Sequence, residues 1–145
     1  MTLTHTRQSL CADAALQLVG LACKAARGAG LAVAVAVVDD AGRLKAFCAM
    51  DGAPLVSTAL AKDKAYTAAA FGLPTDEWHA ALEGTPALLL GLNKAEGFTV
   101  LGGGLPLRHA GALVGGIGVS GASADEDRAI AAAALAGLPG EQPAA

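Results

Sequence analysis

Aromatic side chains and positive charge are both scarce in this chain of 145 residues. It holds three phenylalanines, one tyrosine and one tryptophan, and its 13 aspartates and glutamates outnumber its 10 lysines and arginines. A nucleic-acid-binding protein needs clustered cations for the phosphates and often aromatic rings for the bases. The sequence supplies neither, so we expect no nucleic-acid partner.

Long apolar runs are also lacking. One apolar run spans residues 29–38, which is about half of the ~20 residues that a membrane-spanning helix needs, and no run in the chain approaches that length. Near the N-terminus, Asp13, Gln17 and Lys24 interrupt the apolar stretch that a signal peptide would require. We therefore expect no membrane partner and a cytoplasmic location.

Cysteine is limited to three residues, which excludes a small fold held together by disulfides. Cys11 and Cys23 lie on one predicted helix, too far apart along its axis to be bridged. Cys48 stands alone in the sequence, and there is no Cys-x-x-Cys pair. The sequence thus predicts free thiols that are buried as small hydrophobes.

Apolar and small residues are abundant instead. Hydrophobic residues make up 54% of the chain, and 19 residues are glycine. A chain of this length buries roughly 70% of the surface that its unfolded form exposes, which is enough for a core without metals or disulfides. We expect one domain over residues 1–139 and a flexible tail over residues 140–145.

Apolar periodicity and turn residues predict strands in hairpins, with helices between and around them. This order predicts an α/β protein of the α+β kind, with an antiparallel sheet and helices packed on it. Thr75 is predicted to cap one short helix, Pro86 to begin the next, and Ser123 with Glu126 to form a capping box on the last. The other expected elements are helices from residue 6 or 9 to 27 and over 56–71, and strands over 31–38, 43–49, 98–101, 105–108 and 112–119.

The first predicted strand is apolar on both faces, because residues 32–37 alternate between alanine and valine. Helices on one side alone would leave the other face wet, and a second subunit would cover it. We therefore expect a homo-oligomer.

A glycine-rich stretch, residues 116–121, matches the dinucleotide-binding pattern G-x-G-x-x-G. The second parallel strand and the acidic residue that such a site requires are not found after it. The alternative is a strand whose missing side chains let a backbone or a ligand approach closely. We expect a ligand pocket between the break at residues 50–54, the helix over 56–71 and the glycine-rich strands.

Few polar residues accompany this expected pocket. Lys64 and Thr67 share one face of the predicted long helix, and Asp51 lies in the break before it. A lysine on an alanine-rich helix is either a solvated stem or, beside a pocket, a partner for a ligand carboxylate. The three histidines lie on three separate elements, so we expect no metal site.

Several short motifs follow one another over roughly residues 10–136. They include Val37-Val38-Asp39-x-x-Gly42, Met50-Asp51-Gly52-Ala53, Ala61-Lys62-x-Lys64-Ala65-x-Thr67-Ala68 and Gly115-Gly116-Ile117-Gly118-Val119-Ser120-Gly121. In these motifs the chain resembles the GlcG/HbpS-like proteins, a family that also forms the C-terminal domain of PduO-type adenosyltransferases. The resemblance implies a profilin-like fold, homo-oligomers and, for some members, heme binding. Ala49 departs from the family, which commonly has arginine there.

Two functions remain open. The first is a protein that binds heme or a similar small molecule, with His5 as a candidate for the iron ligand by residue type alone. The second is a cofactor-free enzyme, an isomerase, hydrolase or deaminase acting on a small organic acid, in which Asp51 and Lys64 are catalytic. In either case the expected ligand-binding residues are Asp51, Gly52, Lys64, Thr67, Gly103, Gly104, Gly116, Gly118 and Ser120.

Overall fold

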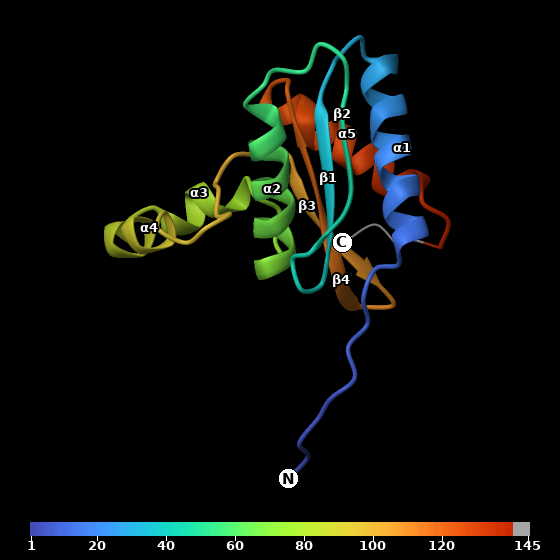
Figure 1. Cartoon of the computed structure of the whole chain (residues 1–145). Coiled ribbons are helices and arrows are strands. Elements are labelled where there is room, and N and C mark those ends of the chain that lie inside the picture. The colour runs from blue at the N-terminus through green and yellow to red at the C-terminus, as the bar shows by residue number, and fades with distance from the viewer. Residues whose placement is uncertain (141–145) are drawn as a thin grey trace.

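The computed structural model describes residues 1–140, so all but the first residue of the predicted tail lies outside the described residues. An extended N-terminal segment leads into helices and two strand hairpins (Figure 1). None of the helices in the described residues has the length and apolar character needed to cross a membrane. The helices are α1 (Ala12–Gly28), α2 (Ser57–Phe71), α3 (Glu77–Leu82), α4 (Pro86–Leu92) and α5 (Ala124–Gly137), and the strands are β1 (Ala34–Asp39), β2 (Leu44–Ala49), β3 (Gly104–His109) and β4 (Ala112–Ser120).

The strands form one antiparallel sheet in the order β2-β1-β4-β3. Each hairpin supplies two neighbouring strands, and β1 pairs with β4 across the middle of the sheet. Helix α2 covers one face, while α1 and α5 cover the other face and contact each other (Figure 1). The predicted α+β class with an antiparallel sheet is confirmed.

The alternation of alanine and valine in β1 separates two packing layers. Val35 and Val37 point into a core shared with α1 and α5, where Leu18 is also fully buried. Ala34 and Ala36 face the other way and pack against alanines of α2. Both faces of β1 are therefore buried within one chain. The wet face from which the homo-oligomer was predicted does not exist.

Three glycines of β3 and β4 form the surface on which α2 lies, and we call Gly104, Gly116 and Gly118 the glycine strip. A Cβ at Gly118 would lie 2.1 Å from the carbonyl oxygen of Ala61, and one at Gly116 would lie 2.4 Å from that of Ala65. Both distances are far inside van der Waals contact. The helix backbone thus packs directly on the strand backbone, which only glycine permits.

Three predicted features of the secondary structure are wrong. Helix α1 begins at Ala12, later than the predicted start at residue 6 or 9, and residues 98–101 form no strand. Thr75 does not cap α3, whose N-terminus has no side-chain cap. The buried Thr75 hydroxyl instead accepts a hydrogen bond from the Gly104 N–H at 2.9 Å. This tertiary bond uses the oxygen that a cap would have used.

Two predicted helix starts are confirmed. Pro86 lies in the first turn of α4. At α5, the Ser123 hydroxyl accepts from the Glu126 N–H at 3.2 Å, and the Glu126 carboxylate accepts from the Ser123 N–H at 2.9 Å. Hydrogen bonds from Ser123 hold the pKa of Glu126 below its ordinary value. The bond from the backbone N–H has the larger effect, and the bond with the hydroxyl has the smaller one. This capping box fixes the first turn of α5, where Asp127 lies.

Helices α3 and α4 project from the body of the protein as an arm (Figure 1). Helix α4 buries none of its residues, and its leucines at positions 88–90 are exposed. At the base of the arm, Phe71, Trp78 and Phe98 pack edge to face, with ring centroids 4.5 to 5.9 Å apart. Three of the five aromatic residues thus hold the arm to the end of α2.

Candidate functional site

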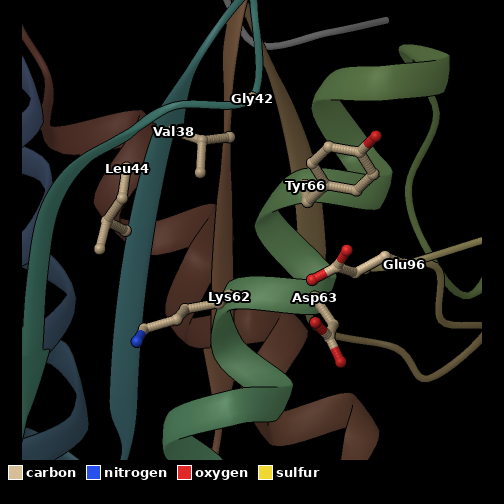
Figure 2. A pocket seen from close by; sticks show the side chains of 8 residues that line it. Val38, Gly42, Leu44, Lys62, Asp63, Tyr66 and Glu96 are labelled. Carbon is tan, nitrogen blue, oxygen red and sulfur yellow. The ribbon is translucent and has the colours of Figure 1, made fainter.

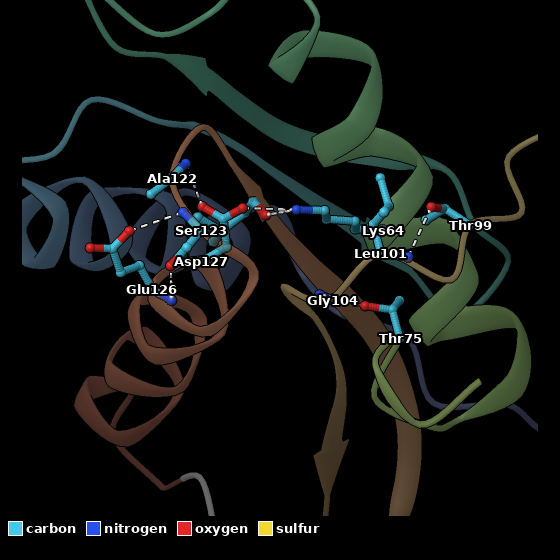
Figure 3. A network of polar contacts seen from close by, with 10 residues as sticks. Lys64, Thr75, Thr99, Leu101, Gly104, Ala122, Ser123, Glu126 and Asp127 are labelled. Atoms are coloured by element: carbon cyan, nitrogen blue, oxygen red, sulfur yellow. Dashed lines mark hydrogen bonds and ion pairs between the residues drawn. The ribbon is translucent and has the colours of Figure 1, made fainter. Parts of the chain in front are cut away.

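Lys64 lies at the centre of a buried polar network (Figure 3). Its ammonium group donates to Asp127 Oδ2 at 2.9 Å and to the Val119 carbonyl at 2.8 Å, and the residue is only 3% exposed. The other Asp127 oxygen accepts from the Ala122 N–H at 3.0 Å. The network joins α2, on one face of the sheet, to α5 on the other. The Lys64 ammonium is therefore occupied inside the protein.

Gly103 leaves room for this ion pair. A Cβ there would lie 2.8 Å from Asp127 Cβ and 3.0 Å from Lys64 Nζ, and its φ of +118° also favours glycine. The three glycines of the glycine strip are needed for α2, as described above. Four of the five predicted ligand-binding glycines thus have a packing reason within the chain, and their role toward a ligand stays a prediction.

Thr67 and Ser120 are both buried. The Thr67 hydroxyl donates to the Gly97 carbonyl at 2.9 Å and accepts from the Thr99 N–H at 3.0 Å. These bonds tie α2 to the segment between α4 and β3. Ser120 ends β4 opposite Ala34. Neither residue lines a cleft described below, so their ligand-binding role also stays a prediction.

Asp51 and Gly52 form an exposed turn away from the Lys64 network. Gly52 adopts a φ of +85°, which the turn requires. Asp51 lines an open cleft of about 310 Å³ together with Arg27, Cys48 and Met50, and we call it the Cys48 cleft. Both bonds of the Lys64 ammonium go to other groups, so the structure does not bring the two predicted catalytic residues together.

The three cysteines are free and lie in different surroundings: Cys11 is exposed, Cys23 is buried and Cys48 is half-buried. The prediction of buried thiols is thus wrong for Cys11. Cys48, which stands alone in the sequence, packs in the folded chain against the core cluster that contains Cys23. Burial, and after it the contact with Cys48, raises the pKa of the Cys23 thiol to about 11.

The larger clefts lie around the rim of the sheet, because α2 itself occupies the glycine strip. The arginine cleft, of about 570 Å³, lies between the end of α2, β3 and α5, and Arg108 and Arg128 line its otherwise largely apolar wall. Arg108 donates to the Gly72 carbonyl at 3.3 Å, and Arg128 forms an ion pair with Asp76. Both guanidinium groups are thus already partly engaged.

The tyrosine cleft, of about 370 Å³, lies beside the start of β2 and α2. A Cβ at Gly42 or Gly97 would lie 2.9 or 2.8 Å from the Tyr66 ring, so these two glycines hold that ring between them. Figure 2 shows the carboxylates of Asp63 and Glu96 next to each other. Burial, and then the charge of Glu96, raises the pKa of Asp63. Lys62 also lines this cleft, but the two carboxylates outnumber it, which is unfavourable for an anionic ligand.

The hairpin cleft, of about 430 Å³, lies between the start of α1 and the hairpin of β3 and β4. The Leu10 N–H donates to the Val114 carbonyl at 3.1 Å and holds the N-terminal segment against β4. His109 and Cys11 both line this cleft, whose wall also includes Leu10 and Val114. The sequence carries no signal for this pairing, because the two residues are far apart along the chain and share no motif.

The other two histidines lie elsewhere. His5 is exposed in the N-terminal segment and lines none of the four clefts above. His79 is exposed on α3, 3.8 Å from Glu83. Over residues 1–140, no three His, Cys, Asp or Glu residues are grouped as a metal site. The role of His5 as an iron ligand stays a prediction.

Comparison with known proteins gives a family match over most of the chain. A family model described as "Haem degrading protein HbpS-like" matches residues 10–136. No curated protein matches the chain.

Solved structures share both the fold and much of the sequence. A double mutant of HbpS from Streptomyces reticuli is 37% identical, with a TM-score of 0.85, and the match covers 93% of this chain and 90% of that one. Protein ORFY of Klebsiella pneumoniae is 29% identical, with a TM-score of 0.87 and 94% of each chain covered. A PduOC:heme complex is 32% identical, with a TM-score of 0.78, and the match covers 92% of this chain and 99% of that one.

Proposed function

Because the chain belongs to the HbpS-like family, we propose that it is a heme-binding protein. Support comes from the similar structure that was solved as a PduOC:heme complex. The observation that carries the proposal is the hairpin cleft, where His109 and Cys11 line one space with an apolar wall.

The residues of the hairpin cleft fit heme by their chemistry. A histidine nitrogen and a cysteine thiolate are both known axial ligands of heme iron. Leu10, Val114 and Leu138 supply apolar surface for the porphyrin, and Gln8 and Ser9 supply polar groups for its propionates. Bound heme would supply a redox-active iron, while the protein supplies the ligands and excludes water from the porphyrin face.

The other clefts fit heme less well. The arginine cleft offers cations for propionates, but no histidine, cysteine, methionine or tyrosine lines it. The tyrosine cleft offers Tyr66, yet Asp63 and Glu96 line it too and would repel propionates. We therefore favour the hairpin cleft for the iron and the porphyrin.

A heme titration of the purified full chain tests this proposal, with binding followed by the Soret absorption band. We expect saturable binding by the wild type. Replacement of the iron ligand in His109→Ala should weaken heme binding at least about tenfold, or 1.4 kcal/mol, and shift the Soret band. Cys11→Ser tests the second ligand in the same way.

His79→Ala is the matched control, because His79 is an exposed histidine on another element. It should leave heme binding and the Soret band unchanged. Wild-type binding in both His109→Ala and Cys11→Ser would overturn the assignment to the hairpin cleft. If His5→Ala weakened heme binding and changed the Soret band instead, the result would support His5, the iron ligand predicted from the sequence.

The alternative, a cofactor-free enzyme for a small organic acid, has less support. Its two catalytic residues, Asp51 and Lys64, belong to separate parts of the structure, and the Lys64 ammonium is already paired with Asp127. Turnover of a small organic acid that is lost in Asp51→Asn, with the fold intact, would revive it.

We also retain the homo-oligomer as a proposal, on a new ground. Leu88, Leu89 and Leu90 expose apolar surface on α4, which a second copy of the chain would cover. Light scattering at micromolar concentration should give more than one chain's mass, and Leu90→Lys should lower that mass. Leu16→Lys, at a similarly exposed leucine of α1, is the control. A single chain's mass for the wild type would refute the proposal. The cytoplasmic location rests on the sequence alone and stays a prediction.

A further inference from the structure

Two thiols meet where α1 packs against the edge strand β2. Cys23 lies on α1 and is 4% exposed, and the half-buried Cys48 of β2 packs against the core cluster that contains Cys23. Helix α1 contacts both β2 and β1 in this region. Cys48 also contributes to the raised pKa of the Cys23 thiol, which is consistent with the packing of the two side chains near each other. The packing of α1 against β2 thus places the two cysteine side chains in the same region of the core.

The two thiols differ in their access to solvent. Cys48 is half-buried and lines the open Cys48 cleft, through which a small reagent can approach it, whereas Cys23 does not line this cleft. Cys23 lies behind it in the core, and burial raises its thiol pKa to about 11, which disfavours a free thiolate there. Arg27 lines the same cleft one helical turn after Cys23, and its charge opposes that rise. Cys48 therefore lies at the cleft together with Arg27, while Cys23 is buried behind them.

We propose that Cys23 and Cys48 form a peroxide-responsive redox pair, in which Cys48 is oxidised first and Cys23 then closes a reversible disulfide. The heme proposal is not needed for this inference, because neither cysteine lines the hairpin cleft. The observations that carry it are the packing of Cys48 against the core cluster that contains Cys23, and the cleft that Cys48 lines and Cys23 does not.

The chemistry balances with hydrogen peroxide as the oxidant. The Cys48 thiolate attacks one peroxide oxygen, the O–O bond breaks, and Cys48 becomes a sulfenic acid while one water leaves. The Cys23 sulfur then attacks the Cys48 sulfur, and the S–OH group leaves as a second water with the Cys23 proton. Two thiols and one peroxide thus give one disulfide and two waters. A thiol reductant reverses the reaction.

The experiment starts from a Cys11→Ser background, because Cys11 is exposed and would otherwise form bonds between chains. The purified protein is treated with hydrogen peroxide, and its free thiols are counted. Intact-mass and peptide mass spectrometry then follow the products. We expect loss of both thiols, a mass lower by two hydrogen atoms, and a crosslinked peptide pair that contains Cys23 and Cys48. Dithiothreitol should restore both thiols.

Two further variants assign the order of events. With Cys23→Ser added, Cys48 should accumulate as a sulfenic acid that dimedone traps. With Cys48→Ser added, loss of the remaining Cys23 thiol should be at least about tenfold slower, because the sulfur reached through the cleft is gone. If either double variant fails to fold, peptide mapping of the Cys11→Ser protein alone still shows whether Cys23 and Cys48 become crosslinked. Free thiols after treatment, or oxidation of Cys48 to sulfinic acid with no crosslinked peptide, would overturn the proposal.

Discussion

The buried ion pair between Lys64 and Asp127 allows a quantitative test by the substitution Lys64→Met. Methionine keeps the length of the side chain and removes the ammonium group. Asp127 would keep its bond from the Ala122 N–H, but the charge on Oδ2 would lose its partner in an almost fully buried place. The Val119 carbonyl would lose its donor as well. If Lys64 had either role predicted from the sequence, a solvated stem or a partner for a ligand carboxylate, the substitution would leave the packing nearly unchanged, and in the second case it would weaken ligand binding.

The size of the effect follows from this burial. Removing one partner of a buried ion pair costs about 3–5 kcal/mol, because the remaining charge stays buried without compensation. For a chain of this length, such a loss lowers Tm by roughly 6–20 °C. Lys62→Met is the matched control on the same helix. Lys62 is exposed, with its ammonium 5.1 Å from the centre of the Phe47 ring, and its loss should cost about 1 kcal/mol or less.

Urea denaturation measures both variants, and a double-mutant cycle with Asp127→Asn isolates the pair. Lys64→Met and Asp127→Asn should each destabilise strongly, while the double variant should cost clearly less than the sum of the two. A loss below about 1 kcal/mol for Lys64→Met would show that the pair is solvated and refute this reasoning. If heme binding fell in that variant with stability unchanged, the ligand role predicted from the sequence would gain support.

Two other predictions concern packing and pH. Gly118→Ala should lower the free energy of unfolding by roughly 1–3 kcal/mol, since its Cβ would meet the Ala61 carbonyl oxygen at 2.1 Å. Gly20→Ala, whose Cβ meets nothing within 4 Å on α1, should stabilise the protein by up to about 1 kcal/mol; equal stability of the two variants in urea would contradict the close packing of α2. Asp63→Asn should stabilise the protein at pH 7, because burial and Glu96 raise the pKa of the folded Asp63 carboxyl. The wild type therefore loses stability as pH rises from the ordinary carboxyl pKa through the raised pKa of Asp63. Below the ordinary carboxyl pKa, the variant should have no stability advantage. A difference in stability between variant and wild type that stays the same in urea titrations at several pH values would rule this out.

Much of the fold could be predicted, because its determinants are local. The alternation of alanine and valine fixes β1 as a strand buried on both faces, and Ser123 with Glu126 marks the start of α5 within four residues of sequence. The capping role assigned to Thr75 failed because its hydroxyl bonds to Gly104 instead, which no local pattern reveals. Predictions of helix caps from local sequence fail where a backbone group from a distant part of the chain bonds to the capping side chain.

The candidate site was harder to predict, because its features depend on contacts between distant residues. A glycine in a strand can make room for a ligand or for another backbone, and the sequence looks the same in both cases. At Gly118 the space is taken by the backbone of α2. Lys64 looks like a solvated stem until Asp127 is placed beside it. Cys23 and Cys48 come near each other, and Cys11 and His109 line one cleft, only because α1 packs against the sheet.

The central pairing of β1 with β4 has a consequence for protein synthesis. Strand β1 is made early, but the strand that completes the middle of the sheet ends only at Ser120. Until then a nascent chain carries a valine-rich strand with one unpaired edge, a feature that promotes association between chains. The paired residues of β1 and β4 are also separated by more than half of the chain, and such distant contacts form slowly. We expect fragments that stop before β4 to aggregate or to require a chaperone, even though they contain the whole of α1, β1, β2 and α2.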